Sequence, residues 1–226
     1  MSRYELRFSG AGGQGLITAG IIMAKAASIY EGKQAVQSQS YGPEARGGAS
    51  KSEVIISDGP IDYPKITKCD ALLAMTQEAA NKYSHDLKEG GVLLVDSDLV
   101  TTLPKGNFKT VSFPIINTAK NDVGREIVAN IVALGAMVAL TGQVTRENAE
   151  KAVLSSVPEA FIELNRKAFS MGYERAMAAA QAQVVPLQVE LQRPAEKSAG
   201  LFASGISRGY FAICFSTCSS LRNSSP

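Results

Sequence analysis

The chain has 226 residues, 45% hydrophobic residues and a formal net charge of +2. This length and composition suit one globular domain of about 150–200 residues with additional segments. Charges of both signs are spread along the chain, and aromatic residues do not alternate with basic ones. The sequence therefore gives no sign of a nucleic-acid-binding surface.

Few residues could carry a metal site, a histidine-dependent active site or a membrane anchor. The three cysteines have neither C-x-x-C nor zinc-ligand spacing; they are Cys69, Cys214 and Cys218. The single histidine, His85, lies on a predicted exposed helix face, which argues against a Ser-His-Asp triad. The start, Met1–Glu5, is not typical of a signal peptide. Only residues 127–144 approach the length of a membrane span. We therefore expect a cytoplasmic protein without a metal site or membrane contact.

A glycine-rich turn follows the first predicted strand. Strand formers at residues 4–8 lead into Gly10-Ala11-Gly12-Gly13-Gln14-Gly15, and the apolar residues 16–27 have helical spacing. Gly10, Gly12 and Gly15 match G-x-G-x-x-G between a strand and a helix. Such a turn lets a ligand approach the backbone, and the helix N-terminus favours an anion such as phosphate. Alternatively, the glycines only allow the strand to pack against the helix.

Two nucleotide-binding motifs fit this turn poorly. A P-loop requires Gly-Lys-Ser/Thr, whereas Gly15 is followed by Leu16 and Ile17. A dinucleotide site requires an acidic residue at the end of the second strand, about 20 residues further on. The predicted second strand, residues 34–39, leads only into serine and glutamine. An NAD-dependent enzyme therefore remains only as a weakened alternative.

A second irregular stretch covers residues 38–50 and contains Tyr41, Glu44 and Arg46. Its glycines and its proline exclude a regular element, and Arg46 could bind a carboxylate or a phosphate. In a doubly wound sheet the carboxyl ends of the first two strands meet at one crevice, so we expect this loop beside Gly10–Gly15. The alternative is a surface loop with an internal Glu44–Arg46 pair.

The rest of the chain alternates between strands and helices up to about residue 184. Further strands are predicted at residues 51–57, 69–75, 92–97 and 109–115. Helices are predicted at residues 76–87, 145–153 and 158–182, and a long helical region opens at Asn117 or Thr118 and is almost wholly apolar over residues 127–140. The fold expected is a three-layer αβα, Rossmann-like, mostly parallel sheet with C-terminal helices. The helix at 127–140 is apolar all round, so it should be buried in the core or against a partner.

Two further features are a pair of acidic residues at a strand end and a change of composition near residue 184. Asp96 and Asp98 end a predicted buried strand and could place a carboxylate in the crevice or cap a turn, of which we favour the cap. Beyond residue 184 the composition changes, with Pro186, Pro194 and many serines. We therefore divide the chain into a domain at 1–184 and an appended tail at 185–226, outside the core fold and either disordered or wrapped on a partner.

The two glycine-rich stretches resemble the gamma subunit of the 2-oxoacid:ferredoxin (acceptor) oxidoreductases, and the 2-oxoglutarate branch is the most similar. The resemblance runs from about Arg3 to Ala180 and is carried by Gly10–Gly15 and Ser40–Ala49, with support from Asn130–Ala136. It implies an assembly with alpha, beta and ferredoxin-like delta subunits. That assembly decarboxylates a 2-oxoacid oxidatively, transfers the acyl group to coenzyme A and passes electrons to ferredoxin or another acceptor.

The resemblance also implies how the cofactors are divided. Thiamine diphosphate, magnesium and iron–sulfur clusters belong to the partner subunits, and coenzyme A lies at the surface of this chain. The residues expected to contribute to binding are Gly10, Gly12, Gly13, Gln14, Gly15, Ser40, Tyr41, Gly42, Glu44, Arg46, Gly47 and Gly48. The N–H groups of Gly12–Gly15 would face phosphate or a polar subunit edge, Gln14 would donate a hydrogen bond, Arg46 would bind an anion and Tyr41 would shape the wall.

No catalytic residue and no metal ligand is expected in this chain, which should be inactive alone. A homodimer of the isolated chain stays open. So does a third reading, in which the chain is a non-catalytic assembly subunit and both glycine loops serve only subunit contacts.

Overall fold

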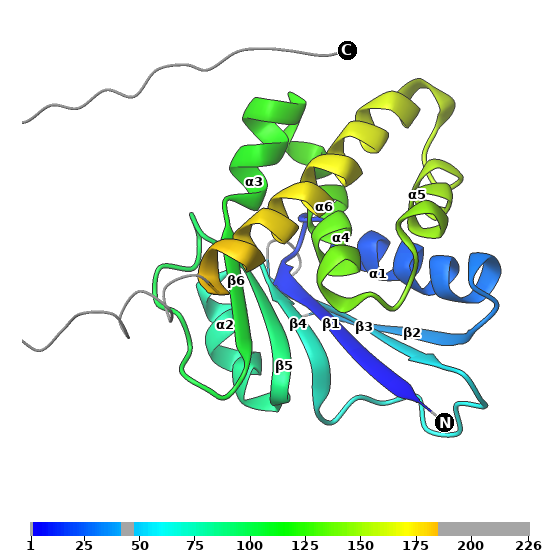
Figure 1. Cartoon of the computed structure of the whole chain (residues 1–226), viewed down its shortest axis with the longest axis vertical. Helices are drawn as coiled ribbons and strands as arrows, with labels where there is room; N and C mark the ends of the chain where they lie inside the picture. Colours follow the sequence, from blue (N-terminus) through cyan, green and yellow to red (C-terminus); the bar gives the residue numbers. More distant parts are fainter. Residues whose placement is uncertain (1, 42–47, 185–226) are drawn as a thin grey trace, which may run out of the picture. The chain divides into compact units, whose positions relative to one another are not determined.

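The computed structural model describes residues 2–41 and 48–184, which form a six-stranded sheet with helices on both faces (Figure 1). The strands are β1 (Arg3–Ala11), β2 (Gln34–Tyr41), β3 (Ala49–Ser57), β4 (Cys69–Ala74), β5 (Leu87–Asp96) and β6 (Lys109–Phe113). Their order in the sheet is β2-β3-β1-β4-β5-β6. Residues 185–226, which we expect to form an appended tail, lie outside the described part of the chain.

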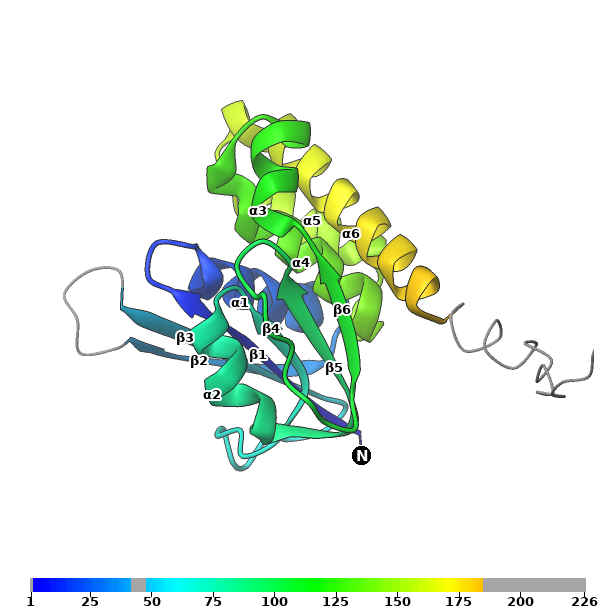
Figure 2. The same ribbon diagram turned by 90° about the vertical axis from the view of Figure 1, so that its left-hand side faces the viewer.

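The helices divide unequally between the two faces of the sheet. They are α1 (Leu16–Lys25), α2 (Gln77–Tyr83), α3 (Ile115–Asn117), α4 (Ala129–Thr141), α5 (Arg146–Leu154) and α6 (Ile162–Val184). Single turns of 3-10 or π type are η1 (Ala26–Tyr30), η2 (Ser84–Asp86), η3 (Thr118–Val123), η4 (Glu126–Val128) and η5 (Glu159–Phe161). Helices α1, α4, α5 and α6 cover one face, and α2 covers the other (Figures 1 and 2). The predicted three-layer α/β fold is confirmed.

Two apolar cores follow from the alternation of side chains along the strands. Phe8 and Leu73 face the larger core, with α1, α4 and α6. Leu72 and Leu93 point the other way and pack with Ala79 and Ala80 of α2. The central strands β4 and β5 are apolar on both faces because each face is covered, which is typical of strands buried in a parallel sheet.

The sheet is mixed, and the exception to parallel pairing lies next to β1. Strand β1 pairs in parallel with β4, β4 with β5, and β5 with β6. Strand β3 pairs antiparallel with both β1 and β2. In a Rossmann unit the second strand would lie directly beside the first. Here β3 separates them, so β2 lies two strand spacings, about 10 Å, from β1.

Three predicted boundaries were wrong for identifiable reasons. The helix predicted at 76–87 ends at Tyr83, and η2 follows it. The glycines of the Glu89–Gly91 segment, read as a helix end, instead interrupt β5, where the register with β4 shifts and Gly90 has φ +73°. The long helical region predicted from Asn117 or Thr118 is divided, with α3, η3 and η4 before α4 begins at Ala129. Ile127, in its apolar part, is 82% exposed rather than buried.

Helix α4 is the central helix of the larger core. Ten of its thirteen residues are buried. It is about 20 Å long at 1.5 Å per residue. Within the described ranges, no helix combines the length and the hydrophobicity needed to cross a membrane. The all-round apolar character of α4 is therefore explained by burial between the sheet and α6.

Helices α4 and α6 touch through their backbones at two glycines. A Cβ built on Gly172 would lie 1.9 Å from the carbonyl oxygen of Val132, and one on Gly135 would lie 2.2 Å from that of Phe169. Both obstacles are main-chain atoms of the opposite helix, which cannot rotate away. Close contact between α4 and α6 therefore requires glycine at these two positions.

We expect Gly172→Ala to destabilise the fold, although alanine normally favours a helix by about 1 kcal/mol over glycine. Overpacking should outweigh that gain and lower the free energy of unfolding by about 1–3 kcal/mol, measured by urea denaturation. Ala178→Gly, at an exposed position of the same helix, is the matched control and should cost about 1 kcal/mol through propensity alone. Stabilisation by Gly172→Ala would contradict the packing argument.

Candidate functional site

The candidate site lies where the chain leaves the sheet in opposite directions. After β1 the chain turns into α1 on one face, and after β4 it turns into α2 on the other (Figure 2). The two turns begin side by side, since the N–H of Met75 donates to the carbonyl of Ser9 at 2.8 Å. This is the switch point of the sheet, where open α/β folds leave a crevice beyond the carboxyl ends of their strands.

The two glycine-rich stretches meet at this edge. The N–H of Gly12 donates to the carbonyl of Gly48 at 2.6 Å, and the hydroxyl of Ser50 donates to the carbonyl of Ala11 at 3.2 Å. The predicted proximity is confirmed at Gly48, but the connection differs from the expected one. The segment does not end a second parallel strand but lies between the antiparallel β2 and β3, and the pairing of β3 with β1 brings Gly48 beside the first turn.

The described residues include only part of the second predicted segment. Ser40 is an exposed residue near the end of β2, and Tyr41 is the last residue of that strand. The predictions for the Tyr41 side chain and for Gly42, Glu44, Arg46 and Gly47 fall outside what the structure describes.

Gln14 organises the first glycine turn from within. Its side-chain oxygen accepts from the N–H of Ala11 at 2.8 Å, and its own N–H donates to the carbonyl of Ala11 at 3.3 Å. A Cβ on Gly10 would lie 2.3 Å from that side-chain oxygen and 2.9 Å from the Cβ of Met75. Gly10 is therefore required for packing and does not face a ligand.

The prediction that all N–H groups from Gly12 to Gly15 face a ligand was wrong for two of them. Those of Gly12 and Gln14 are bonded to carbonyls of the chain itself. Those of Gly13 and Gly15 have no acceptor among the described residues. Gly15 is the N-cap of α1 and has no side chain to cap it, so the first-turn N–H groups of that helix also remain available.

Gly15 also connects α1 to α4. It adopts a left-handed φ of +72°, and the side-chain amide of Asn130 donates to its carbonyl at 3.3 Å. A Cβ at this position would lie 2.8 Å from the Asn130 amide nitrogen. The alternative given from the sequence, in which the glycines only allow the strand to pack against the helix, therefore explains why Gly10 and Gly15 are glycines. Gly13 differs, because it is exposed and a Cβ added there would meet no atom within 4 Å.

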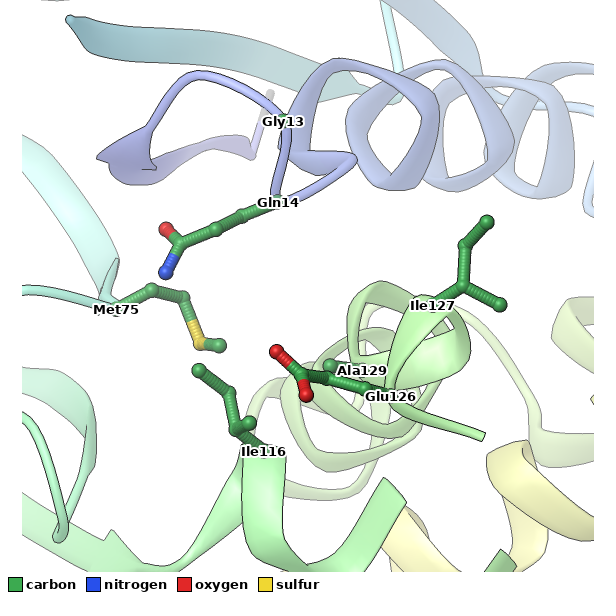
Figure 3. Close-up of a pocket in the computed structure, with 7 residues that line it drawn as sticks. All are labelled: Gly13, Gln14, Met75, Ile116, Glu126, Ile127 and Ala129. Carbon is green, nitrogen blue, oxygen red and sulfur yellow. The ribbon is translucent and has the colours of Figure 1, made fainter. Parts of the chain in front are cut away.

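A pocket of about 210 Å³ opens beside this turn. It is lined by Gly13, Gln14, Met75, Ile116, Glu126, Ile127 and Ala129. The side chains of Gln14, Met75, Ile116 and Glu126 point toward one another (Figure 3). Because the oxygen of Gln14 is held by Ala11, its amide nitrogen is the atom that can donate to a ligand. The pocket thus offers a neutral donor and a carboxylate acceptor across an apolar floor.

A larger, more open cavity of about 590 Å³ adjoins this pocket and shares Gln14, Ile116 and Glu126 with it. Its remaining lining residues are Asp98, Leu99, Asn117, Lys120 and Asn121. The sequence reading missed the contribution of residues 116–126. Their position directly after β6 was the available signal, because the end of every parallel strand reaches the same edge.

Asp96 proves to be structural, as favoured from the sequence. It is fully buried at the end of β5, and its carboxylate accepts from the N–H groups of Asp98, Leu99 and Ile116. These three bonds fix the turn after β5 and the start of α3. Asp96 therefore shapes the crevice without presenting a free carboxylate to it.

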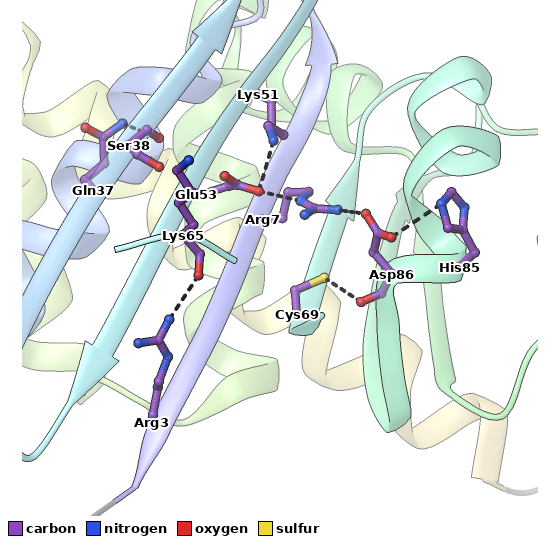
Figure 4. Close-up of polar contacts among 10 residues, drawn as sticks. All are labelled: Arg3, Arg7, Gln37, Ser38, Lys51, Glu53, Lys65, Cys69, His85 and Asp86. Carbon is purple, nitrogen blue, oxygen red and sulfur yellow. Dashed lines mark hydrogen bonds and ion pairs between the residues drawn. The ribbon is translucent and has the colours of Figure 1, made fainter. Parts of the chain in front are cut away.

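A second polar cluster lies on the α2 face of the sheet (Figure 4). Arg7 is 3% exposed, donates to Glu53 at 2.9 Å and to Asp86 at 2.5 Å, and stacks on the Tyr83 ring. Burial opposes its charge, but the hydrogen bond to Asp86 and the neighbouring Glu53 outweigh it and raise the pKa of Arg7. Every charge in this cluster has a partner. The cluster therefore connects β1, β3 and η2, and none of its charges is free to bind a ligand.

Neither cysteine nor metal chemistry is indicated in the part of the chain that the structure describes. Burial raises the pKa of the Cys69 thiol to about 11, so it is protonated at neutral pH. His85 is exposed and lies 3.3 Å from Asp86. The described ranges contain no group of three or more His, Cys, Asp or Glu side chains able to hold a metal ion.

Comparison with known proteins places this geometry in a family. Residues 5–175 match the family model described as pyruvate ferredoxin/flavodoxin oxidoreductase. The chain belongs to this family. It is 55% identical over 174 residues to 2-oxoglutarate synthase subunit KorC of Methanocaldococcus jannaschii, covering 76% of this chain and 93% of that protein. The resemblance expected from the two glycine-rich stretches is confirmed, and the chain is a gamma subunit of a 2-oxoacid:ferredoxin oxidoreductase.

Solved structures agree. The gamma subunit of a keto/oxoacid ferredoxin oxidoreductase from Geobacter sulfurreducens PCA is 80% identical with a TM-score of 0.75, covering 79% of this chain and 99% of that one. The 2-oxoglutarate:ferredoxin oxidoreductase of Magnetococcus marinus, solved with 2-oxoglutarate, coenzyme A and succinyl-CoA bound, shares the fold. Its TM-score is 0.68 at 21% identity, and the match covers 79% of this chain but 32% of the longer one.

We expect Gly15→Ala to cost more stability than Gly13→Ala. Both place alanine at a positive φ, +72° and +94° respectively, which costs roughly 1–2 kcal/mol. Only the first also collides with Asn130. Urea denaturation of both variants measures the difference.

A double-mutant cycle with Asn130→Ala isolates the collision, because removing the Asn130 amide should recover part of the Gly15→Ala penalty, with a coupling energy of about 0.5–3 kcal/mol. Equal penalties at the two glycines, or zero coupling, would show that Asn130 does not dictate the glycine.

Proposed function

We propose that this chain is the gamma subunit of a 2-oxoglutarate:ferredoxin oxidoreductase and that it binds part of coenzyme A in the crevice beyond β1, β4 and β5. The observation that carries the proposal is the continuity of the two cavities through Gln14, Ile116 and Glu126. The choice of 2-oxoglutarate follows the similarity to 2-oxoglutarate synthase subunits.

The chemistry of the crevice suits the two parts of coenzyme A. Its phosphates match the N–H groups of Gly13 and Gly15, the N-terminus of α1 and the Lys120 ammonium at the open cavity. Its pantetheine arm is mostly apolar and carries amides. An amide carbonyl can accept from Gln14, an amide N–H can donate to Glu126, and Met75 and Ile116 supply apolar contact.

Glu126 limits where the phosphates bind. Glu126 lines both cavities, and its carboxylate repels an anion, so the space beside it suits the uncharged arm. The phosphates then belong away from Glu126, at the exposed Gly13 on the rim of the smaller pocket and at Lys120 in the larger cavity. Arg46, predicted from the sequence to bind an anion, would complete the phosphate contacts from the β2–β3 loop.

The reaction proposed is oxidative decarboxylation of the 2-oxoacid, in which coenzyme A takes the acyl group and ferredoxin or another acceptor takes the electrons. Bound thiamine diphosphate with magnesium supplies the carbanion chemistry, and iron–sulfur clusters carry the electrons. We assign these groups to alpha, beta and delta partner subunits, as the resemblance to 2-oxoacid:ferredoxin oxidoreductases implies. This chain binds and orients coenzyme A and contributes no catalytic residue.

Two further expectations remain proposals. We infer that the family domain ends near residue 184 and that residues 185–226 are an appendage, because the family match ends at residue 175 and a match over 79% of this chain already covers 99% of the Geobacter subunit. A cytoplasmic location remains the expectation from the sequence.

The alternative of an NAD-dependent enzyme is not favoured. A Rossmann site needs an acidic residue at the end of a second strand that lies beside the first. Here β3 occupies the place beside β1, and β2 ends in Ser40 and Tyr41. The ribose carboxylate is absent from that strand, and so is the geometry that would place it.

We expect Gln14→Glu to weaken coenzyme A binding while leaving stability unchanged. A carboxylate oxygen can still accept from Ala11, so the turn is kept. The donor amide is lost and a negative charge is added beside the free N–H groups, which should raise Kd for coenzyme A by about tenfold or more. Calorimetry on the assembled enzyme measures this value, and an unchanged Kd would remove Gln14 from the ligand site.

Arg46→Ala separates ligand binding from assembly. If Arg46 binds a phosphate of coenzyme A, Kd should rise by about tenfold, and the effect should shrink at high salt. Lys151→Ala, at an exposed residue of α5 paired with Glu147, removes one positive charge elsewhere and should change neither property. Weaker subunit association with unchanged coenzyme A affinity would instead assign the loop to an interface.

A further inference from the structure

The most exposed large apolar side chain of the described residues borders the candidate site. Ile127 is 82% exposed, although it lies just before the buried helix α4. It lines the 210 Å³ pocket on one side and a second cavity of about 240 Å³ on the other. It therefore forms the wall between the candidate site and a neighbouring hollow.

The second cavity is apolar and lies between α1, α4 and α6. Its apolar lining includes Ile22, Val128, Ile131, Val157, Phe161 and Leu164. Phe161 at its rim is 42% exposed. Single exposed apolar residues are ordinary on a protein surface. Here two of them, Ile127 and Phe161, border the same apolar cavity, which makes this face a candidate interaction site.

Among the polar groups that line this cavity, the positive charge of Arg125 has no acidic partner in the described ranges. The amides of Asn130 and Asn165 are already engaged, donating to the carbonyls of Gly15 and Phe161 respectively. Arg125 lines the same cavity and is exposed, and none of the acidic side chains in the described ranges pairs with it. The cavity thus combines an apolar hollow with a positive rim.

We propose that this cavity receives an apolar side chain, adjacent to an acidic residue, from the partner subunit that completes the coenzyme A site. The acidic residue would pair with Arg125, and the apolar one would cover Ile127 and Phe161. The inference rests on the proposed function. It deepens that function by assigning the surface through which this chain joins its assembly.

We propose a different subunit, rather than a second copy of this chain, as the occupant of the cavity because of how the same fold occurs in related enzymes. In the Magnetococcus marinus enzyme this fold accounts for 32% of a longer chain. There it is part of a longer chain, whereas the Geobacter sulfurreducens relative is itself a gamma subunit and is matched over 99% of its length. A docking surface beside the crevice supplies a connection to another subunit without a covalent link.

Docking at this cavity has a consequence for the candidate site. Ile127 and Glu126 are consecutive, and Glu126 points into the pocket that Ile127 borders (Figure 3). A partner covering Ile127 therefore also shields Glu126 and Gln14 from water. The hydrogen bonds proposed for coenzyme A gain strength when water is excluded, so assembly and ligand binding should support each other.

The test uses this chain co-expressed with the thiamine-binding subunits of its own enzyme. Ile127→Asp places a charge in the docking surface and should weaken subunit association by tenfold or more, measured by titration of purified subunits. Ile29→Asp is the matched control, because Ile29 is 67% exposed in η1 and lines none of the three described cavities. It should associate like the wild type. Circular dichroism should show both variants folded.

Arg125→Glu should also weaken association, more strongly at low salt than at high salt. Wild-type association with Ile127→Asp would overturn the inference, as would equal losses with Ile29→Asp. So would dissociation of a homodimer by Ile127→Asp with partner binding intact, because the occupant would then be a second copy. Failure of the wild-type chain itself to associate with the thiamine-binding subunits would contradict the proposed function instead.

Discussion

The hydrogen bond from the N–H of Gly12 to the carbonyl of Gly48 fixes the backbone at the edge of the sheet where the candidate site lies. It joins the turn after β1 to the start of β3, two segments that lie far apart in the sequence. With Gly12 held, Gln14 folds back onto Ala11, and the turn leaves free only the N–H groups of Gly13 and Gly15 among the described residues. The turn itself therefore offers few main-chain donors, and the backbone fixes the direction of each.

The same constraint explains why a Rossmann-like sheet does not give a Rossmann-type cofactor site. Placing β3 antiparallel between β1 and β2 brings Gly48, just before β3, beside the glycine turn. That insertion displaces the strand end on which a ribose-binding acid would lie. Residues 116–126, after β6, close the other side of the crevice. Among the described residues, the proposed ligand surface is thus built from the turn after the first strand and the segment after the last strand.

Sequence reasoning predicted the layers and the strands, because these depend on periodicity. It expected the glycine stretches to meet from a doubly wound topology, whereas the observed contact at Gly48 follows from the antiparallel β3. It could not predict the antiparallel β3, since residues 49–57 read equally well in either direction. It assigned too many N–H groups to the ligand because the bond to Gly48 joins distant residues. It took Ile127 as the first residue of the apolar, buried part of one long helix, although α4 begins only at Ala129. Helix ends depend on local hydrogen bonds that hydrophobicity does not report.

The failed boundary at Ile127 is informative about assembly. A continuous apolar run from 127 to 140 suits one buried helix, and the structure buries almost all of it. The residue left outside lies between the candidate ligand pocket and an apolar cavity with a positive rim. Burying an isoleucine side chain contributes about 1.5–3 kcal/mol, which this fold does not gain within the described residues. A gamma subunit works within a larger enzyme. The free energy of burying Ile127 therefore remains available for contact with another subunit, between the proposed docking cavity and the proposed ligand pocket.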